Sequence, residues 1–598
     1  MFTCIASYHC CIITTLIAVS VAIPTFTETI HLEKLSTVYL PYRYENDVGQ
    51  FMYPSGAAEQ TAYDPASQFI YIVGGDVLHV LDITDVSNPT VIYWQQFINV
   101  DLTDVEFCGD HLFVAVDNNS NKENGFINVY RKYNTTTGTL DLMHRITVGS
   151  LPDMIYPTSD CLTVVVAVEA EAYHNGSHFV DPEGGVGIIK FTTNAGVNGA
   201  YQYRKLDFRK FNNKWQDLVS RGARFIYREN NNTFSNDLEP EYITFNKDES
   251  IAYLSLQENN AIAEVDVRTQ NITNIHPLGF KNWTNSELDS SDRDQKINIR
   301  PWPVMGMYQP DSIKAIHIKG KSYLVTANEG DSKDYSGIPG SGGFNEESRV
   351  SDLNISASSI ITRWANLNGF SGTLDEDENL GRLKVSKLDG QSGDTYDTLY
   401  AYGARSISII DLDTFERVYD SGGEMERKVA EYENALFNGD GLAEIVSTTK
   451  DSRSDDKGPE VEDLAVGEIG DLMLLFVGLE RPGFIAIYSI PDGINSIQFE
   501  SIYTGIPITN DTFEDLYNQR QISEIDPEDI RFISAQDSPN KKHILCSAGA
   551  LSGTLSIFEI KGLNNDVTSS GVRAVDHVGV SFMGCILIIG TLISSIFG

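Results

Sequence analysis

The sequence predicts an all-β fold, a β-propeller of seven or eight blades with long loop insertions. Two observations favour this fold. Short strand-like stretches separated by polar turns run through the chain, and one unit of four such stretches recurs loosely along it. Helical periodicity is nearly absent outside the two ends of the chain. Four short strands per repeat, joined by polar turns, is typical of a propeller blade.

The clearest repeat covers residues 239–278, EPEYITFNKDESIAYLSLQENNAIAEVDVRTQNITNIHPL. Three strands are predicted at 242–245, 251–256 and 261–267, and a fourth near 272–275. The turns between them, such as NKDES and QENN, are polar, as hairpin turns usually are. Further units begin at Glu59, Asp104, Leu151, Gln309, Leu383, Gly458 and Asp526.

Three other segments bear on the shape of the propeller. The stretch HLEKLSTVYL at 31–40 is predicted to close the ring by adding a strand to the last blade. Closure would remove exposed strand edges, which otherwise invite aggregation. The segments 279–303 and 330–379 interrupt the repeats, and we expect them to be surface loops.

The N-terminus resembles a secretory signal peptide. Residues 10–21 form an uncharged, mostly apolar run, and the small residues Ser20 and Ala22 give a cleavage signal after Ala22. We therefore expect a signal peptide at 1–22.

The C-terminus has the pattern of a glycosylphosphatidylinositol (GPI) anchor signal. Residues 578–598 carry no charge, and small residues beginning at Ser569 precede a short polar stretch. These features predict an ectodomain at 23–568, a removed signal at 569–598 and lipid attachment at Ser569. The alternative is a true tail-anchored membrane span, although such a span normally has basic residues beyond it.

Glycosylation signals agree with passage through the secretory pathway. Eight N-x-S/T sequons occur, at Asn118, Asn134, Asn175, Asn231, Asn271, Asn282, Asn354 and Asn510. The predicted mature chain keeps three cysteines, so it is no disulfide scaffold. Cys108 and Cys161 lie near equivalent points of adjacent repeats, which leaves a bridge between them open.

The charge balance is strongly acidic. The chain has 83 acidic and 44 basic residues, a formal net charge of −39. This balance excludes a nucleic-acid partner, because phosphates are bound by lysine and arginine. It favours attraction of cations such as Ca²⁺, although a solvated extracellular surface accounts for most of the acids.

Acidic residues recur at two points of the repeat that a propeller would bring to the same face of the ring. The starts of first strands carry Asp153, Glu241, Asp311, Glu460 and Glu528, each directly after a proline. The ends of second strands carry Asp117, Glu169, Glu258, Glu329 and Glu480. We therefore expect these side chains to surround one mouth of the central channel.

A dense ring of carboxylates needs a counter-charge, and Ca²⁺ is the natural occupant because it takes several oxygen ligands in flexible geometry. The alternative is that these acids serve as turn residues bonding backbone N–H groups between blades. The candidate metal ligands are Glu241, Asp311, Glu329, Asp331, Asp455, Asp456, Glu460, Glu480 and Glu528.

Several long motifs resemble one known family. They include YLVTANEGDSKDY at 323–335, DSRSDDKGPEVEDLAVGEI at 451–469 and FVGLERPGFIAIY at 476–488. Together they resemble the choice-of-anchor I family over roughly 59–560, including its animal branch of mesenchyme-specific cell-surface glycoproteins. The resemblance implies a propeller-like ectodomain, a lipid-anchored cell-surface location and an association with calcium-based biomineralisation. Bacterial relatives are often labelled alkaline-phosphatase-like.

The chain departs from the family pattern in the last repeat, where Gly549 and Ala550 replace an acidic Asn-Glu pair. This loss argues against catalysis and against a full set of metal ligands.

Three functions follow from these observations. The first is a non-enzymatic, GPI-anchored glycoprotein on the outer face of the plasma membrane, with a Ca²⁺-binding propeller face serving biomineralisation or cell-surface interaction. The second is a metal-dependent phosphoesterase in which Arg405 or Arg481 holds the phosphate. No nucleophile or general base for it can be named from the sequence. The third is a scaffold that binds an extracellular protein ligand, since a fold alone does not choose among functions.

Overall fold

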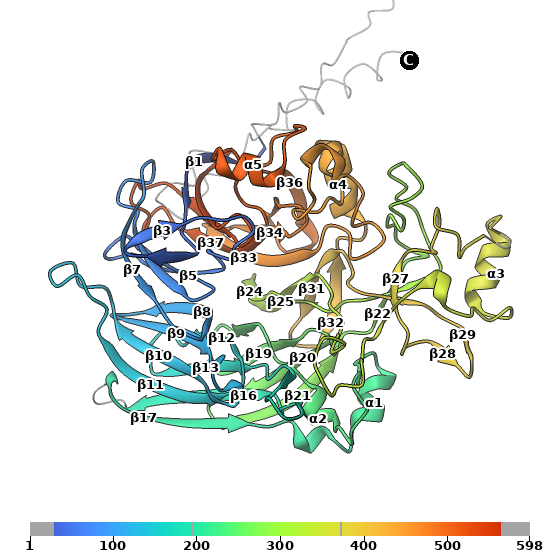
Figure 1. The fold of residues 1–598 in the computed structure, drawn as a ribbon, viewed down its shortest axis with the longest axis horizontal. Helices are drawn as coiled ribbons and strands as arrows, with labels where there is room; N and C mark the ends of the chain where they lie inside the picture. The colour runs from blue at the N-terminus through green and yellow to red at the C-terminus, as the bar shows by residue number, and fades with distance from the viewer. Residues whose placement is uncertain (1–28, 193–195, 371–372, 564–598) are drawn as a thin grey trace, which may run out of the picture.

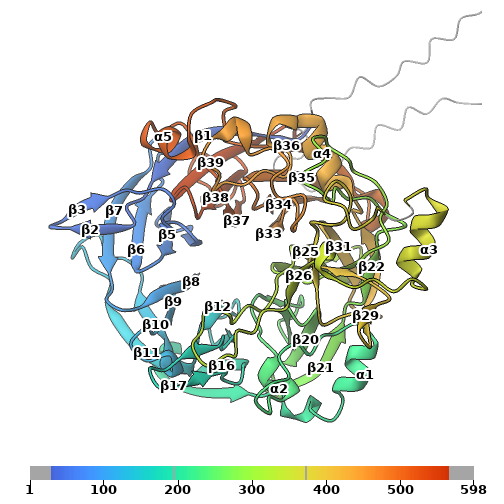
Figure 2. The ribbon, with the colours of Figure 1, turned by 45° about the vertical axis from the view of Figure 1, so that its right-hand side comes forward.

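The computed structural model describes residues 29–192, 196–370 and 373–563. The expected signal peptide at 1–22 and the anchor signal at 569–598, with Ser569, lie outside the described residues. Seven four-stranded antiparallel sheets are arranged radially, and their first strands contact one another in a closed ring (Figures 1 and 2). The predicted all-β propeller is confirmed, and it has seven blades.

The first four blades follow one another along the chain. Blade 1 contains β4 (Gln60–Asp64), β5 (Phe69–Gly74), β6 (Val77–Asp82) and β7 (Thr90–Gln96). Blade 2 contains β8 (Asp101–Cys108), β9 (His111–Asp117), β10 (Gly125–Arg131) and β11 (Leu142–Gly149). Blade 3 contains β12 (Pro152–Pro157), β13 (Thr163–Val168), β16 (Gly185–Thr192) and β17 (Gly196–Leu206). Blade 4 contains β18 (Ile243–Phe245), β19 (Ile251–Leu256), β20 (Ala261–Asp266) and β21 (Asn271–Pro277).

Three more blades complete the ring. Blade 5 contains β24 (Ile313–Ile318), β25 (Lys321–Asn328), β31 (Ser406–Asp411) and β32 (Glu416–Asp420). Blade 6 contains β33 (Val461–Ile469), β34 (Leu472–Leu479), β35 (Phe484–Ile490) and β36 (Gln498–Tyr503). Blade 7 contains β37 (Pro527–Ile533), β38 (Ile544–Gly549), β39 (Thr554–Lys561) and β1 (His31–Tyr39). The hairpins β2 (Arg43–Glu45) with β3 (Val48–Gln50), β14 (Tyr173–His174) with β15 (Phe179–Val180), and β28 (Gln391–Ser392) with β29 (Thr395–Tyr396) lie outside the blades.

The last blade takes strands from both ends of the described chain. Strand β1 pairs antiparallel with β39, in a register running from His31 opposite Lys561 to Tyr39 opposite Thr554. The prediction that the segment 31–40 closes the ring is therefore confirmed. Strand β1 thereby covers the edge of β39, which would otherwise be left unpaired at the outside of the blade.

The two repeats predicted at Gln309 and Leu383 are one blade. The chain leaves blade 5 after β25 and returns to the same sheet as β31, where Leu324 pairs with Ile410. The unit beginning at Leu383 therefore supplies the outer half of blade 5 rather than a blade of its own. The sequence could not show this, because about 80 residues separate two strands that lie side by side.

The insertions predicted as surface loops form a packed unit beside blade 5. Together with residues that follow each of them, they build a five-stranded sheet from β22 (Phe280–Asn282), β23 (Met305–Met307), β30 (Tyr400–Ala401), β27 (Lys384–Ser386) and β26 (Glu347–Arg349). Trp283 and Trp302 are fully buried in its core, against which α3 (Ile360–Leu367) packs. The loop prediction was wrong because this core combines apolar residues from both insertions, which only tertiary contact unites.

Interior strands of the blades are buried on both faces, because each blade is packed between two neighbours. Every residue of β5 and β9 is buried, and both read as near-continuous apolar runs. A disulfide joins Cys108 in blade 2 to Cys161 in blade 3, the pairing that the sequence left open.

The remaining helices are short and lie on loops between strands (Figure 1): α1 (Trp215–Ser220), α2 (Phe234–Asp237), α4 (Glu424–Tyr432) and α5 (Phe513–Asn518). Within the described residues, no helix is both long enough and apolar enough to span a bilayer.

Candidate metal-binding site at the channel mouth

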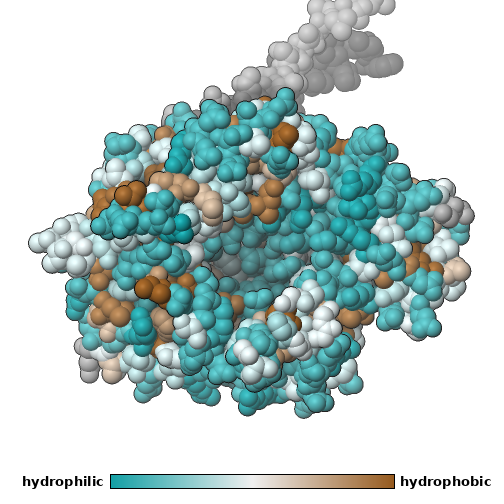
Figure 3. All heavy atoms as spheres, in the orientation of Figure 1, coloured by the Kyte–Doolittle hydropathy of each residue, from teal (hydrophilic) through white to brown (hydrophobic). Residues whose placement is uncertain are grey.

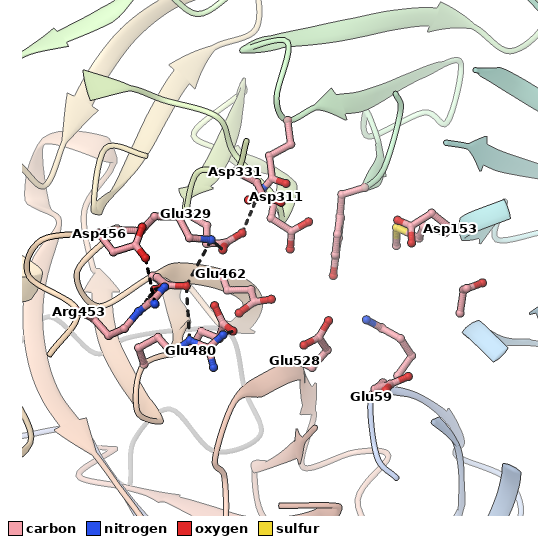
Figure 4. Close-up of a pocket in the computed structure, with 18 of the residues that line it drawn as sticks. Glu59, Asp153, Asp311, Glu329, Asp331, Arg453, Asp456, Glu462, Glu480 and Glu528 are labelled. Carbon is pink, nitrogen blue, oxygen red and sulfur yellow. Dashed lines mark hydrogen bonds and ion pairs between the residues drawn. The ribbon is translucent and has the colours of Figure 1, made fainter. Parts of the chain in front are cut away.

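The end of the channel where the first strands begin opens into a polar cavity, which we call the mouth. Its volume is about 590 Å³, and carboxylates dominate its lining. The space-filling view shows a hydrophilic hollow at the centre of the ring (Figure 3). Acidic side chains from different blades point into this hollow, among them Asp153, Asp311, Glu462 and Glu528 (Figure 4).

Irregular pairing at the start of first strands aims several of these acids at the channel. The register between first and second strands shifts in blades 3, 6 and 7, at the points where Asp153, Glu462 and Glu528 lie. A β-bulge leaves a residue unpaired and redirects its side chain. At these bulges the acidic residues are not paired in the strand ladder, and their carboxylates face the channel.

A second set of acids, one position further along, holds neighbouring blades together. The Oδ2 atom of Asp104 accepts a hydrogen bond from the Ile155 backbone N–H at 2.7 Å. Asp463 bonds the N–H of Ile530 in the same way at 2.7 Å. Asp529 accepts from the N–H of Thr61 at 3.1 Å. The inter-blade role considered from the sequence is thus performed by these buried aspartates.

Burial raises the pKa values of the inward-facing acids. The pKa of Glu59 rises to about 7 and that of Asp153 to about 6, chiefly through desolvation. Desolvation and then repulsion from neighbouring carboxylates raise the pKa values of Asp311, Glu462 and Glu528 well above their ordinary range. A cation in the mouth would relieve this repulsion and favour the charged forms.

Three basic residues, Arg453, Lys457 and Arg481, gather on one side of the mouth, and we call them the basic corner. Arg453 lies 2.6 Å from Oε1 of Glu460, and Lys457 lies 3.3 Å from its Oε2. Arg481 pairs with Glu480. Burial is the largest influence on the pKa of Glu460 and raises it, but Lys457 and Arg453 outweigh it, so the net shift is downward.

Two groups of three carboxylates converge closely enough to share one metal ion. One is Glu329, Glu460 and Glu480, and the other is Glu462, Glu480 and Asp526. In each group, one oxygen per residue lies within 4.8 Å of the others. Such spacing suits Ca²⁺, whose oxygen ligands lie at about 2.3–2.6 Å from the ion. Burial raises the pKa of Asp526 to about 7, although Arg481 opposes this shift.

Most of the predicted ligands reach the mouth. The cavity is lined by Asp311, Glu329, Asp331, Asp456, Glu460, Glu480 and Glu528. Glu241 is not part of the lining. Burial and then repulsion from Glu258 raise its pKa, and the mouth acids Asp311 and Asp153 add to this repulsion.

Asp455 was expected to be a metal ligand, but it lies outside the mouth. Its carboxylate is 2.6 Å from Arg349 and 2.8 Å from Arg382, outside the cavity lining. Two arginines already satisfy this buried group, so it serves as an ion-pair partner between the insertion and the loop before blade 6.

Arg405 was expected to be able to hold a phosphate, but it is buried away from the mouth. The side chain is 2% exposed, and it pairs with Glu426 at 2.7 Å. It also donates to the backbone carbonyls of Asp289, Ser454 and Asp456. Its donors are committed to fixing loops, so it cannot receive a phosphate. Of the two arginines considered from the sequence, Arg481 alone lines the mouth.

Sequence reasoning missed Glu462 and Asp526. Aligning the Glu-Asp pair at 462–463 with the pair at 528–529 would have found them. That alignment places Asp526 at the repeat position of Glu460, and Glu462 at that of Glu528. The shared proline-acid pairs instead align Glu460 with Glu528, two positions out of register.

Comparisons with known proteins identify a family and several relatives. The model of the choice-of-anchor I domain matches residues 59–493. Over 204 residues the chain is 37% identical to Gigasin-3a of Magallana gigas, covering 34% of this chain and 72% of that protein. Over 312 residues it is 28% identical to the mesenchyme-specific cell surface glycoprotein of Strongylocentrotus purpuratus, covering 49% and 40%. The chain thus spans less than half of the second relative.

Two solved structures are similar over most of the chain, at low TM-scores. Hydrazine synthase of Kuenenia stuttgartiensis gives a TM-score of 0.41 at 10% identity, covering 86% of this chain and 99% of that one. The WD40 domain of coronin from Toxoplasma gondii gives 0.40 at 11% identity, covering 90% and 88%.

Proposed function

The chain belongs to the choice-of-anchor I family, and from that premise we propose that it is a Ca²⁺-binding glycoprotein of the outer cell surface. The observation that carries the proposal is the convergence of carboxylates from several blades at one mouth. Acids held together in this way are stable only if protonated, paired with bases or bound to a cation.

The donor set favours calcium over other metals. No histidine or cysteine is among the described residues that line the mouth, whereas zinc is bound mainly by those residues. Magnesium demands near-ideal octahedral geometry and keeps several of its waters. Long glutamate side chains from separate blades suit the larger and more flexible coordination shell of Ca²⁺.

The surface location rests on three observations. The sequence carries a signal-peptide pattern and a lipid-anchor pattern with attachment at Ser569. Seven of the eight sequon asparagines are exposed and Asn118 is partly exposed, so all can receive a glycan. One relative is named as a cell surface glycoprotein.

The direction of the strands sets how an anchored propeller would face. Strand β37 begins at the mouth, and β39 runs from the mouth at Thr554 to the opposite end at Lys561. His31 lies beside Lys561. A lipid attached beyond the described chain would therefore place the membrane at the far end of the channel, with the acidic mouth facing away from the cell.

Calcium held on such an outward face would serve mineral deposition or calcium-dependent contact with an extracellular protein. The two roles differ in what the bound ion meets: a mineral surface supplies anions such as carbonate or phosphate, and a protein supplies carboxylates. Retention of the purified ectodomain on calcium carbonate crystals, lost when mouth carboxylates are neutralised, would favour mineral deposition.

The first test is a calorimetric Ca²⁺ titration of the glycosylated ectodomain, residues 23–568, after treatment with a chelator. We expect saturable binding of a few ions that survives moderate salt. Weak uptake that disappears with added salt would contradict the proposal, since diffuse surface attraction is screened by ions.

The anchor is tested separately on cells that express the full chain. We expect phosphatidylinositol-specific phospholipase to release the protein into the medium. Retention on the cells after treatment, with release of a known lipid-anchored control, would contradict lipid anchoring.

A further inference from the structure

The two carboxylate groups at the mouth share Glu480 but differ in how their charges are met. In the group Glu329–Glu460–Glu480, basic residues already lie beside the carboxylates, although Oε2 of Glu460 accepts no hydrogen bond from a described residue. Lys457 bonds Oε1 of Glu329, and Gln257 donates to Oε2 of the same residue at 2.7 Å. Lys457 also lies 3.3 Å from Glu460. Its ammonium thus contacts two of the three acids of this group.

In the group Glu462–Glu480–Asp526, two acids have an oxygen without a protein partner. Oε2 of Glu462 and Oδ1 of Asp526 are buried, and no described residue donates a hydrogen bond to either. Asp526 is 7% exposed and Glu480 is 8% exposed. A buried carboxylate oxygen without a donor is costly. Here two of them lie on a group whose members meet within 4.8 Å.

The charge count of this side of the mouth points the same way. Five carboxylates, those of Glu329, Glu460, Glu462, Glu480 and Asp526, face the three bases of the basic corner. If all are ionised, the acids of the two groups exceed these bases, and Asp331 in the same lining adds to the excess. A divalent cation would reduce this excess negative charge.

We propose that Glu462, Glu480 and Asp526 bind one Ca²⁺ ion, and that Lys457 is a built-in cation that keeps metal out of the neighbouring group of Glu329, Glu460 and Glu480. This inference rests on the proposed function and assigns its site. A lysine ammonium is a compact point charge with three donors, so it can stand where a metal would otherwise bind three carboxylates.

The fixed cation also limits the number of ions in this corner. Lys457 contacts both Glu329 and Glu460, so a second ion in the first group would have to displace its ammonium. The lysine thus makes the corner a one-ion site.

The test compares matched neutralising variants of the two groups by Ca²⁺ calorimetry on the chelator-treated ectodomain. Asp526→Asn and Glu462→Gln should each weaken Ca²⁺ binding by about tenfold or more. The matched control Glu329→Gln removes the same charge from the same cavity, and its affinity should stay within about threefold of the parent. Circular dichroism and thermal unfolding verify that each variant is folded.

The lysine is tested by stoichiometry. Lys457→Gln should bind one more Ca²⁺ per molecule than the parent, because the vacated group becomes open to metal. If this variant does not fold, the comparison of Asp526→Asn with Glu329→Gln still decides the site.

The outcomes separate this inference from the proposed function. A parent protein without saturable Ca²⁺ binding would contradict the proposed function itself. A parent that binds Ca²⁺, with binding lost in Glu329→Gln and kept in Asp526→Asn, would overturn the assignment while leaving the function intact. Unchanged stoichiometry in a folded Lys457→Gln variant would overturn the role of the lysine.

Discussion

Glu241 precedes the first strand of blade 4 and Glu460 precedes that of blade 6, and the pKa values of the two shift in opposite directions. Each is a buried glutamate directly after a proline, near the start of its blade. Burial and then repulsion from Glu258 raise the pKa of Glu241 well above its ordinary value. For Glu460 burial acts in the same direction, but Lys457 and Arg453 outweigh it and lower the pKa.

The difference comes from a loop, and not from the strands. Lys457 and Arg453 lie in the loop before blade 6, which Arg405 fixes by donating to the carbonyls of Ser454 and Asp456. The largest charges that act on Glu241 are all acidic, those of Glu258, Glu169, Asp311 and Asp153. The comparison teaches that two glutamates with the same local sequence signature, each directly after a proline, acquire different charge states from the loops that meet them.

The largest effect is expected from removing the residue that fixes this loop. Arg405→Ala should lower the free energy of unfolding by about 4 kcal/mol, because it leaves Glu426 buried without its partner. Urea unfolding measures the change. The control Arg221→Ala breaks an exposed pair with Asp217 and should cost at most about 1 kcal/mol. Equal effects of the two substitutions would contradict the role of Arg405.

The next largest effect is expected at Glu460, beside the basic corner. Glu460→Gln should lower the free energy of unfolding by about 3 kcal/mol, since it leaves Lys457 and Arg453 buried beside a neutral group. The substitution keeps the shape of the side chain, so packing is conserved. A stability equal to that of the parent, measured without Ca²⁺, would mean that these pairs contribute nothing.

A smaller effect is expected from pH. Glu59, Asp331 and Asp526 have pKa values of about 7 in the fold, against about 4 when unfolded. The folded protein therefore binds more protons between these values, and its stability falls as the pH rises through about 7. Without Ca²⁺, the melting temperature should be several degrees lower at about pH 8 than at about pH 6.5.

Buried histidines set the lower limit of the pH range, and saturating Ca²⁺ serves as the control. The window starts near pH 6.5 because burial lowers the pKa values of His79, His111, His276 and His543. These groups destabilise the fold as the pH falls below the pKa of an unfolded histidine, about 6.5. Saturating Ca²⁺ should reduce the difference, because the ion favours the charged carboxylates. A melting temperature that rises across this window without Ca²⁺ would contradict the raised pKa values at the mouth.

The smallest effect should have the opposite sign to that of Glu460. Glu241→Gln should raise the free energy of unfolding without Ca²⁺ by about 1 kcal/mol, because it removes a buried carboxylate whose strongest charged neighbours are acids. Oε2 of Glu241 has no hydrogen-bond partner among the described residues, so no bond is lost at that atom. If Glu241→Gln destabilised the protein as much as Glu460→Gln, the proposed difference between the two glutamates would be contradicted.

The sequence by itself determined the propeller and the face on which its acids gather. Both depend on local periodicity: strands alternate with polar turns, and acids recur at the same points of each repeat. The repeat at 239–278 could be divided into its four strands to within a residue or two. The closing strand at 31–40 could also be predicted, because it stands alone before the first repeat.

Only the tertiary structure decided the number of blades, the packed insertion unit and the composition of the site. Each of these depends on which distant segments meet, as when β31 returns to β25 to complete blade 5. The same is true of charge. Local sequence does not show that Arg405 donates to loop carbonyls or that Glu462 lies close to Asp526. Burial and neighbours from other blades set the charge state of each of these groups.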